Sequence, residues 1–252
     1  MILIFGGTTE GKKTAQLLED MRRPFLYSTK TRVNHSFNIG TSIYGAKDEG
    51  EMVSLCENER IRLIIDAAHP FAENLHRTVS DIAHRLNIPS VRYERINEDR
   101  VVHPLIHYVS DYQNVLDTLH QLGNPTLLAL SGVQSIPKLA RYWTQHTTYF
   151  RILDRPESLA VATQCHFPLK NLLFGLPPKY AISEIKLIKY LEVAAMLTKE
   201  SGKSGNQSTK MEAAITTGIP LLILKRPKLP CYKYQVKDSF SLRELVTKLT
   251  DS

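Results

Sequence analysis

The first candidate site is a glycine-rich turn near the start of the chain, where a buried strand is expected to pass into a helix. The apolar run of residues 2–5 ends at this turn, and residues 12–21 have the pattern of a helix. Glycines let a backbone approach an anion closely, and the amide groups and dipole of a helix N-terminus face that anion. We therefore predict a nucleotide phosphate at the turn, which consists of Gly6, Gly7, Thr8, Thr9, Glu10 and Gly11.

The spacing of the glycines within this turn does not identify a particular nucleotide-binding motif. It matches neither the G-x-G-x-x-G pattern nor the G-x-x-x-x-G-K-S/T pattern, because Lys13 stands where the second pattern requires a hydroxyl residue. A tight strand-to-helix turn that binds no ligand is the alternative interpretation.

A polar and basic segment follows the second expected strand, residues 25–28. In dinucleotide-binding folds an Asp or Glu at this place bonds the ribose hydroxyls. This chain has hydroxyl groups and two cations instead, in Ser28, Lys30 and Arg32. Those groups suit a 2′-phosphate, so the segment favours NADPH over NADH. The alternative is a basic loop that is merely solvated.

Another loop, Asp66-Ala-Ala-His69-Pro70-Phe71, closes a strand of almost pure aliphatic residues. His69 is expected there to contact a pyrophosphate or a substrate carboxylate. The alternative is that Asp66 caps the following helix and His69 hydrogen-bonds locally. His69 and His76 lack the spacing of a zinc pair on one helix, and no other set of ligands completes a site, so no metal is predicted.

The loop from Thr198 to Gly205 follows the expected strand 193–197 and is rich in hydrogen-bond donors and glycines. This composition suits an anion-binding nest. Lys199, at the strand end, is the lysine expected to bind a carboxylate or to donate a proton. A flexible surface loop is the alternative. The sequence has no G-x-S-x-G elbow and no cysteine beside a plausible base, which argues against a hydrolase.

Short apolar runs alternate with amphipathic stretches along the whole chain, which predicts an α/β fold with parallel sheets and crossover helices. Ten strands are expected, beginning at residues 2, 25, 62, 90, 106, 126, 149, 171, 193 and 221. This number exceeds one small doubly wound sheet, so we predict two Rossmann-like domains. The polar stretch 94–104 is the expected linker, between a dinucleotide-binding domain at residues 1–100 and a substrate domain at residues 101–252.

The two halves share a faint repeat. Residues 63–95 and 193–226 each consist of a strand, a loop, a helix, a turn ending in Ile-Pro, a second strand and an arginine. Ligands of open parallel sheets lie at the carboxyl ends of strands. The loops of both repeats are therefore expected to face a cleft between the domains.

Composition and charge narrow the class of partner. The chain has 252 residues and a formal net charge of +7, which favours an anionic partner. No nucleic-acid-binding motif appears, so a dinucleotide or a polycarboxylate explains the charge, as does a merely basic surface. Three widely spaced cysteines predict a reducing cytoplasm, and no apolar run is long enough to span a bilayer.

In combination these motifs resemble the precorrin-6A reductase and cobalt-precorrin-6A reductase family of cobalamin biosynthesis. The glycine-rich turn, the Asp66–Ala72 block, Arg92-Tyr-Glu-Arg95 and the Lys-Glu-Ser-Gly block at 199–202 occur in the family's order, and the segment 218–227 also fits. The resemblance implies a two-domain enzyme that transfers hydride from NADPH to a corrinoid macrocycle bearing many carboxylates. It also implies substrate hand-over with other enzymes of that pathway.

Site residues follow from the resemblance by position. The glycine-rich turn and His69 correspond to the nucleotide site, and Ser28, Lys30 and Arg32 to the 2′-phosphate site. The positions expected to contact the substrate are Phe71, Ser201 and Gly202. We expect Lys199 to protonate the reduced macrocycle, with Asp154 as the second candidate for this acid.

Two departures concern the substrate contacts. Glu200 stands where the family has Asn, and Gly175-Leu-Pro-Pro178 stands where the family has Gly-Pro-Phe. The sequence leaves open whether the macrocycle carries cobalt. The alternative functions are an NADPH-dependent oxidoreductase that acts on another substrate and a non-catalytic nucleotide-binding protein.

Overall fold

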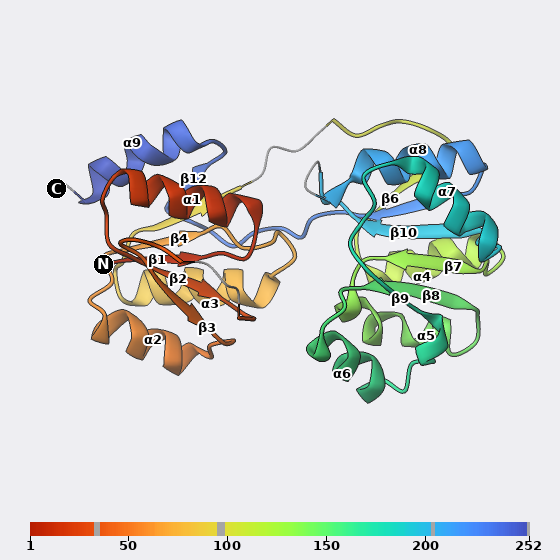
Figure 1. The fold of residues 1–252 in the computed structure, drawn as a ribbon, viewed down its shortest axis with the longest axis horizontal. Coiled ribbons are helices and arrows are strands. Elements are labelled where there is room, and N and C mark those ends of the chain that lie inside the picture. The colour runs from red at the N-terminus through yellow and green to blue at the C-terminus, as the bar shows by residue number, and fades with distance from the viewer. Residues whose placement is uncertain (33–35, 95–98, 203–204, 251–252) are drawn as a thin grey trace. The chain divides into compact units, whose positions relative to one another are not determined.

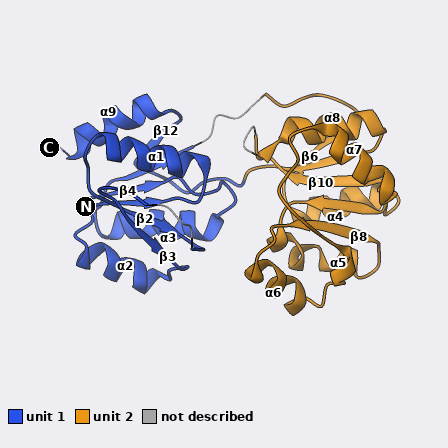
Figure 2. Ribbon diagram, in the orientation of Figure 1, with its two compact units in different colours: residues 1–96, 227–252 blue, residues 97–226 orange. Residues whose placement is uncertain are grey.

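Two six-stranded parallel sheets form the framework of the chain. The computed structural model describes residues 1–32, 36–94, 99–202 and 205–250. It divides into unit 1, Met1–Ile96 with Pro227–Ser252, and unit 2, Asn97–Arg226, each with its own sheet (Figures 1 and 2). The predicted α/β class with two Rossmann-like domains is confirmed.

The sheet of unit 1 has the strand order β3-β2-β1-β4-β5-β12. Its strands are β1 (Ile2–Phe5), β2 (Phe25–Thr29), β3 (Thr41–Tyr44), β4 (Leu63–Asp66), β5 (Ser90–Tyr93) and β12 (Tyr234–Val236). Its helices are α1 (Thr9–Asp20), α2 (Glu49–Asn58), α3 (Glu73–Arg85) and α9 (Ser239–Thr250). This is the 3-2-1-4-5-6 order of dinucleotide-binding folds, and its direction reverses between β1 and β4.

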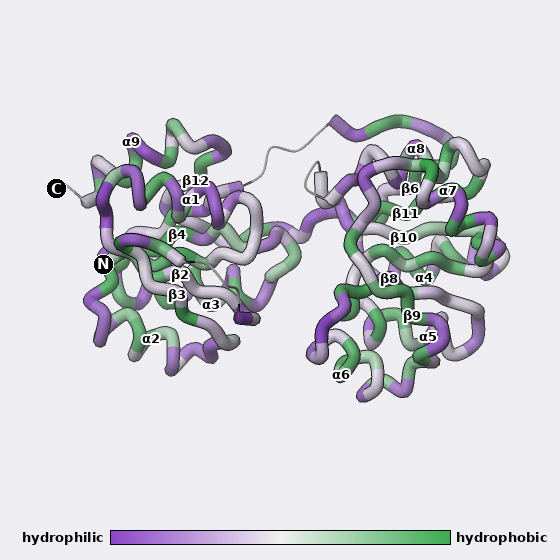
Figure 3. The backbone as a smooth tube through the Cα atoms, in the orientation of Figure 1, coloured by the Kyte–Doolittle hydropathy of each residue, from purple (hydrophilic) through white to green (hydrophobic). Residues whose placement is uncertain are grey.

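Alternation along β1 explains why both faces of this sheet are covered by helices. Ile2 and Ile4 pack into one core cluster with residues of α1 and α9, whereas Leu3 and Phe5 pack into another with residues of α2 and α3. Successive side chains of a strand point to opposite faces, so an uninterrupted apolar run is buried on both sides. Figure 3 shows hydrophobic residues through the sheets and hydrophilic residues on outer turns of α1 and α9.

The sheet of unit 2 has the order β9-β8-β7-β10-β11-β6. Its strands are β6 (Ile106–Val109), β7 (Leu127–Leu130), β8 (Thr148–Ile152), β9 (Leu172–Phe174), β10 (Ala195–Lys199) and β11 (Leu221–Leu224). Its helices are α4 (Tyr112–Gln121), α5 (Ala140–Trp143), α6 (Pro156–Gln164), α7 (Ala181–Tyr190) and α8 (Gln207–Thr217), with short 3₁₀ helices η1 (Val133–Ser135), η2 (Pro137–Leu139) and η3 (Leu169–Asn171).

Both sheets have the same spatial arrangement when β7 is matched to β1. Strands β7, β8 and β9 then correspond to β1, β2 and β3, and β10 and β11 correspond to β4 and β5. The repeat detected at 63–95 and 193–226 is therefore the fourth strand, helix and fifth strand of each sheet. The sixth position is filled by the chain's last strand, β12, in unit 1 and by the first strand of the unit, β6, in unit 2.

The predicted extent of the second domain, residues 101–252, is wrong at its end. Residues from Pro227 onward belong to unit 1, where β12 pairs with β5 and α9 contributes Leu242 and Val246 to the core. The strand β12 has three residues, of which only Val236 is buried, so no local apolar run identifies it. The expected linker does contain the boundary, although residues 95–98, including Arg95, lie outside the described residues.

Smaller differences concern single elements. Strand β3 was not predicted, because this edge strand has no buried position and its residues are mostly polar. The spacing of residues 134–142 predicts one helix, but the structure has η1, η2 and the single turn α5 there. The pattern Ser241-Leu-Arg-Glu244 predicts a capping box at Ser241, but helix α9 begins at Ser239, and Asp238 Oδ1 accepts the Ser241 amide at 2.8 Å.

Candidate functional site

The glycine-rich turn lies where the strand order of unit 1 reverses, between the carboxyl ends of β1 and β4. A Cβ on Gly6 would lie 2.3 Å from the ring of Tyr27, and one on Gly11 would lie 2.7 Å from Gly6 Cα. Gly7 has a φ of +83°, which side-chain-bearing residues rarely adopt. The turn therefore requires glycine at all three positions.

Thr8 joins this turn to the loop after β4. Its Oγ1 accepts the amide of Gly11 at 3.0 Å, which caps α1, and donates to the carbonyl of Ala67 at 2.6 Å. Within the described residues, the amides of Thr8 and Thr9 donate no hydrogen bond, and Thr9 is exposed. These two amides lie at the positive end of α1 and are suited to bind an anion.

The glycine amides of the turn bond the protein itself. Gly6 donates to the carbonyl of Ser28 at 2.9 Å, and Gly7 donates to the hydroxyl of Tyr27 at 3.0 Å. Glu10 lies in the first turn of α1, where a carboxylate interacts favourably with the helix dipole. Of the predicted phosphate contacts, the backbone amides of Thr8 and Thr9 stay available to an anion.

The basic segment after β2 presents two cations to solvent. Lys30 and Arg32 are exposed, and the guanidinium of Arg32 lies 5.3 Å from the ring centroid of Tyr44. Ser28 is buried, and its carbonyl holds the glycine-rich turn. Of the three residues predicted to contact a 2′-phosphate, only the two cations are therefore accessible.

The buried carboxylate of Asp66 is the most densely bonded group in unit 1. It accepts hydrogen bonds from His76 Nδ1 at 2.6 Å, Arg92 Nη1 at 2.9 Å, the Ala68 amide at 2.9 Å and the Tyr232 hydroxyl. Burial alone would raise the pKa of Asp66, but the hydrogen bond from His76 and the charge of Arg92 hold it below its usual value. Burial and the same carboxylate raise the pKa of Tyr232.

His76 connects this carboxylate to the loop after β4. Its Nε2 lies 3.0 Å from the carbonyl oxygen of His69, while its Nδ1 faces Asp66. Both ring nitrogens face acceptors, so the imidazole satisfies both bonds when each nitrogen carries a proton. The network fixes the backbone of Ala67–His69, which also receives the Thr8 hydroxyl.

His69 makes the local hydrogen bond that was the alternative interpretation. Its Nδ1 accepts the Phe71 amide at 3.2 Å, and the two rings lie 5.8 Å apart. The companion alternative, that Asp66 caps α3, is wrong, because the N-cap of α3 is Ala72 without a side-chain cap. His69 is exposed and Phe71 is half-buried.

In unit 2 the Lys199–Gly202 loop lies at the reversal point between β7 and β10. Lys199 is the last residue of β10 and is half-buried. The amides of Ser201 and Gly202 both donate to Gln207 Oε1, at 2.9 and 3.1 Å. Two amides of the loop predicted to form an anion nest, Thr198–Gly205, thus already bond an oxygen of the chain itself, and residues 203–204 lie outside the described residues.

Glu200, the departure from the family pattern, is neutralised within unit 2. It accepts hydrogen bonds from Arg100 Nε at 2.9 Å and Nη2 at 3.3 Å, and from the Arg226 amide at 3.0 Å. Partial burial would raise the pKa of Glu200, but the hydrogen bonds and charge of Arg100 lower it overall. The additional negative charge is thus paired with a cation of the same unit.

The two candidates for the proton donor follow different strands. Lys199 ends β10, whereas Asp154 is exposed in the bend after β8, and β7 lies between these strands. Neighbouring strands are about 4.8 Å apart, so the carboxyl ends of β10 and β8 are separated by about 10 Å. Lys199 and Asp154 stay two separate predictions for the proton donor.

Buried Lys210 was missed by the sequence analysis. Its Nζ donates to Thr198 Oγ1 at 3.0 Å and to the Gly205 carbonyl at 2.9 Å. Burial lowers the pKa of Lys210 to about 8. The available signal was helical spacing, since Lys210 shares one face of α8 with buried Ala213 and Ala214, as His76 shares one face of α3 with Val79 and Ala83.

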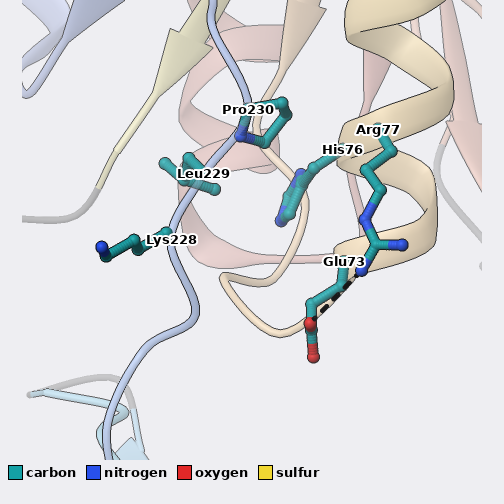
Figure 4. Close-up of a pocket in the computed structure, with 6 residues that line it drawn as sticks. All are labelled: Glu73, His76, Arg77, Lys228, Leu229 and Pro230. Atoms are coloured by element: carbon teal, nitrogen blue, oxygen red, sulfur yellow. Dashed lines mark ion pairs between the residues drawn. The ribbon is translucent and has the colours of Figure 1, made fainter. Parts of the chain in front are cut away.

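A pocket of about 270 Å³ opens in unit 1 between α3 and the segment that returns from unit 2 (Figure 4). Its lining residues are Glu73, His76, Arg77, Lys228, Leu229 and Pro230. Among the described residues no group of His, Cys, Asp and Glu is suited to a metal ion, and no helix is long and apolar enough to cross a membrane.

The family model for precorrin-6x reductase CbiJ/CobK matches residues 1–249. The chain belongs to this family. It is 30% identical to a precorrin-6A reductase of Rhodococcus erythropolis over 91% of this chain and 90% of the relative. It is 25% identical to a cobalt-precorrin-6A reductase of Methanocaldococcus jannaschii over 90% of this chain and 91% of that relative.

The fold agrees with a solved member of the same family. The structure of CobK precorrin-6A reductase superimposes with a TM-score of 0.77 over 98% of this chain and 96% of that chain, at 20% identity. The resemblance found in the motifs is confirmed, and with it an oxidoreductase of cobalamin biosynthesis.

Proposed function

We propose that this chain reduces a precorrin-6A-type macrocycle with hydride from NADPH. The observation that supports a cofactor site is a pair of backbone amides, those of Thr8 and Thr9, that donate no hydrogen bond among the described residues. They lie at the start of α1, where the strand order of unit 1 reverses. A pyrophosphate suits this place because the positive end of α1 faces it, and Gly6 and Gly11 let the turn close against Tyr27 and against itself. When bound, the cofactor supplies the hydride, and the chain's residues hold and orient the reactants.

The preference for NADPH over NADH rests on Lys30 and Arg32. Both are exposed beside the end of β2, where the adenosine ribose lies in folds of this strand order. A guanidinium and an ammonium favour a phosphate over a hydroxyl group. The exposed Tyr44 beneath the Arg32 guanidinium supports this position for the cation.

For the substrate we propose contacts from Phe71, Ser201 and Gly202, and protonation by Lys199 with Asp154 as the second candidate. His69, which lies on the same loop as Phe71, is proposed to contact the cofactor. The cleft expected between the two domains stays a prediction. Three free cysteines support a reaction in the reducing cytoplasm.

The test is an anaerobic assay of NADPH oxidation with precorrin-6A and cobalt-precorrin-6A as separate substrates. We expect oxidation with at least one macrocycle, and the stronger substrate identifies whether cobalt is required. If NADPH binds but neither macrocycle is reduced, the non-catalytic alternative is supported. If NADH binds as tightly as NADPH, the proposed role of Lys30 and Arg32 is wrong.

A further inference from the structure

The connection between β2 and β3 in unit 1 differs from its counterpart in unit 2. Its described residues, 30–32 and 36–40, contain neither a helix nor a strand. The equivalent connection in unit 2, from β8 to β9, contains α6 and the short η3. Side chains from other elements must therefore hold residues 36–40, which we call the anchored segment.

Glu19, near the end of α1, holds the anchored segment through its carboxylate. Its two oxygens accept the amides of Asn38 at 3.1 Å, Ile39 at 2.9 Å and Gly40 at 3.0 Å. These bonds, that from Ile39 above all, lower the pKa of Glu19. Gly40 also lies so close to β2 that a Cβ on it would overlap the Phe25 ring. The segment is therefore docked on unit 1 before any ligand arrives.

Phe37 joins the anchored segment to the glycine-rich turn through Tyr27. The centroid of its ring lies 5.1 Å from that of Phe25 and 5.3 Å from that of Tyr27. Tyr27 is almost fully buried, and its ring occupies the space that a side chain on Gly6 would need. The Tyr27 hydroxyl accepts the Gly7 amide at 3.0 Å. A continuous line of contacts thus connects the segment to the turn.

Unit 2 contains the same pair of rings without the hydroxyl group. Tyr27 lies opposite Ile4 of β1, and Phe150 lies opposite Ala129 at the equivalent position of β7. Phe150 packs edge-to-face on Phe167, which follows α6, with 5.0 Å between the ring centroids. Packing of two rings is therefore common to both sheets, whereas the hydroxyl group occurs in unit 1 alone and bonds the glycine-rich turn.

The amides suited to an anion directly follow the residue that Tyr27 holds. Thr8 and Thr9, whose amides donate no hydrogen bond among the described residues, come next after Gly7. A hydrogen bond weakens steeply as its angle departs from linearity, so a small rotation of the turn would weaken both contacts to an anion. Gly7 has more backbone freedom than other residues, and a fixed support restricts this freedom before a ligand binds.

We propose that Phe37 and Tyr27 are positioning residues of the cofactor site. Phe37 keeps the Tyr27 ring against the turn, and the Tyr27 hydroxyl orients the Gly7 peptide, so that the amides after it face the pyrophosphate. Glu19 keeps Phe37 in place through the anchored segment. The inference rests on the proposed function, in which this turn holds the cofactor. These side chains do not contact the cofactor and take no part in the redox step.

The first experiment measures the dissociation constants of Tyr27→Phe and Phe37→Leu for NADPH and for NADH, at a temperature at which both variants are folded. Tyr27→Phe removes only the hydroxyl group and is expected to weaken the binding of both cofactors about fivefold to tenfold, because the pyrophosphate is common to both. Phe37→Leu is expected to weaken both about threefold. The KM for NADPH should rise in parallel, and the KM for the macrocycle should stay unchanged.

Phe167→Leu is the matched control in unit 2. It removes the equivalent ring contact, that with Phe150, and is expected to lower the unfolding temperature at least as much as Phe37→Leu does. It should leave the dissociation constants of both cofactors unchanged. A merely structural role of Phe37 would lower the stability of both variants without weakening cofactor binding in either, and this result would overturn the proposal.

The double variant Tyr27→Phe with Phe37→Leu tests whether Phe37 acts through Tyr27. Because the two residues are in contact and serve the same turn, the double variant is expected to weaken NADPH binding by less than the product of the two single effects. The full product would mean that the two residues act independently, and it would overturn the proposed action of Phe37 through Tyr27.

The anchor at the end of α1 is tested with Glu19→Gln. This variant weakens the bonds to three backbone amides and is expected to weaken the binding of both cofactors about twofold to threefold. Asp20→Asn is the control, because it removes the same charge at the next residue, whose carboxylate accepts the Gln16 side chain instead. Equal effects of the two variants would show a general effect of charge and would overturn the role of Glu19.

The outcomes separate this inference from the proposed function. Unchanged NADPH binding by Tyr27→Phe and Phe37→Leu would overturn the inference and leave the reductase function intact. Weaker binding of NADPH alone would also overturn it, because the effect would then lie at the 2′-phosphate. If the unaltered chain binds NADPH but reduces no macrocycle, weaker binding by these variants supports the inference and contradicts the proposed function. If the unaltered chain binds neither cofactor, both are overturned.

Discussion

The two units share one sheet arrangement but differ in chemistry at one equivalent position near the end of the fourth strand. In unit 1, Asp66 of β4 lies opposite Phe5, the last residue of β1. In unit 2 the equivalent position is Thr198 of β10, which lies opposite Leu130, the last residue of β7. A buried carboxylate in one unit is thus replaced by a neutral hydroxyl in the other.

The helix after each of these strands supplies a buried side chain with hydrogen-bonding nitrogen from its fourth residue. In α3 this is His76, which binds Asp66 and the carbonyl of His69. In α8 it is Lys210, which binds Thr198 and the carbonyl of Gly205. Both side chains tether the loop at the reversal point, but only His76 meets a carboxylate on its strand.

The first loops of the two sheets differ as well. After β1, the glycine-rich turn leads into the 12-residue helix α1, whose N-terminus can hold an anion. After β7, Gly132 leads into the three-residue 3₁₀ helix η1, and the hydroxyls of Ser131 and Ser135 bond each other at 2.7 Å. The two units therefore share a strand order without sharing a function, because the loops at the strand ends decide which ligand each unit can bind.

The largest expected effect is that of Asp66→Asn, which breaks the buried network of unit 1. Removing one partner of a buried charge cluster costs about 4 kcal/mol of unfolding free energy, since His76 and Arg92 both lose the Asp66 carboxylate and Arg92 keeps only Glu94 as a counterion. Thr198→Val, the matched change in unit 2, removes a neutral acceptor and is expected to cost about 1 kcal/mol. Urea unfolding of both variants measures the difference, and equal costs would contradict the contrast drawn between the units.

The same carboxylate predicts acid sensitivity of the unaltered chain. The folded-state pKa of Asp66 is lowered, so its contribution to stability is present above the ordinary aspartate pKa of about 3.9. This contribution is lost as the pH falls through the lower folded value, because the unfolded chain binds the proton first. The free energy of unfolding should therefore fall less steeply between about pH 5 and 2 in Asp66→Asn than in the unaltered chain.

The second prediction compares one glycine from each unit. Gly6→Ala is expected to cost about 3 kcal/mol, because the new methyl group meets the buried Tyr27 ring at 2.3 Å. It should also weaken NADPH binding at least tenfold by distorting the turn. Gly132→Ala has no neighbour within 4 Å among the described residues and should cost about 1 kcal/mol through its positive φ alone. Thermal unfolding and NADPH titration test both, and intact NADPH binding by Gly6→Ala would remove the turn from the cofactor site.

The third prediction concerns Lys210 at alkaline pH. Its folded-state pKa of about 8 lies below the ordinary value of 10.5, so the unfolded chain holds more protons between these values. Stability from this group therefore rises with pH between about 8 and 10.5, by up to about 3 kcal/mol. The unfolding free energy of the unaltered chain minus that of Lys210→Met should show this rise. If the difference does not change with pH, burying the charged form of Lys210 does not destabilise unit 2.

The smallest expected effect is that of the cations after β2. Arg32→Met and Lys30→Met are each expected to weaken NADPH binding about fivefold to tenfold and to leave NADH binding unchanged. Dissociation constants for both cofactors provide the measurement. Arg155→Met, at the exposed N-cap of α6 after the equivalent strand β8 of unit 2, is the control and should change neither. Equal losses for NADH and NADPH would show a general rather than a 2′-phosphate contact.

Local pattern was sufficient for most of the fold. Strands β1 and β11 begin at the residues predicted, because each is a run of four apolar residues. Strand β12 was missed, since an edge strand with one buried residue leaves no such run. The start of α9 was misplaced by two to three residues. For the site, the glycine-rich turn was found, but the network around Asp66 was not.

The amino-acid sequence by itself determined the α/β class, the position of the glycine-rich turn, the repeat of strand, helix and strand, and the family. These follow from local periodicity, from glycines at constrained backbone positions and from motif order. Tertiary structure alone decided that residues after Pro227 complete unit 1, that Tyr232 reaches Asp66 across 166 residues, and that Arg100 neutralises Glu200. Such pairings depend on which strand ends become neighbours in a sheet, and local pattern carries no information about this.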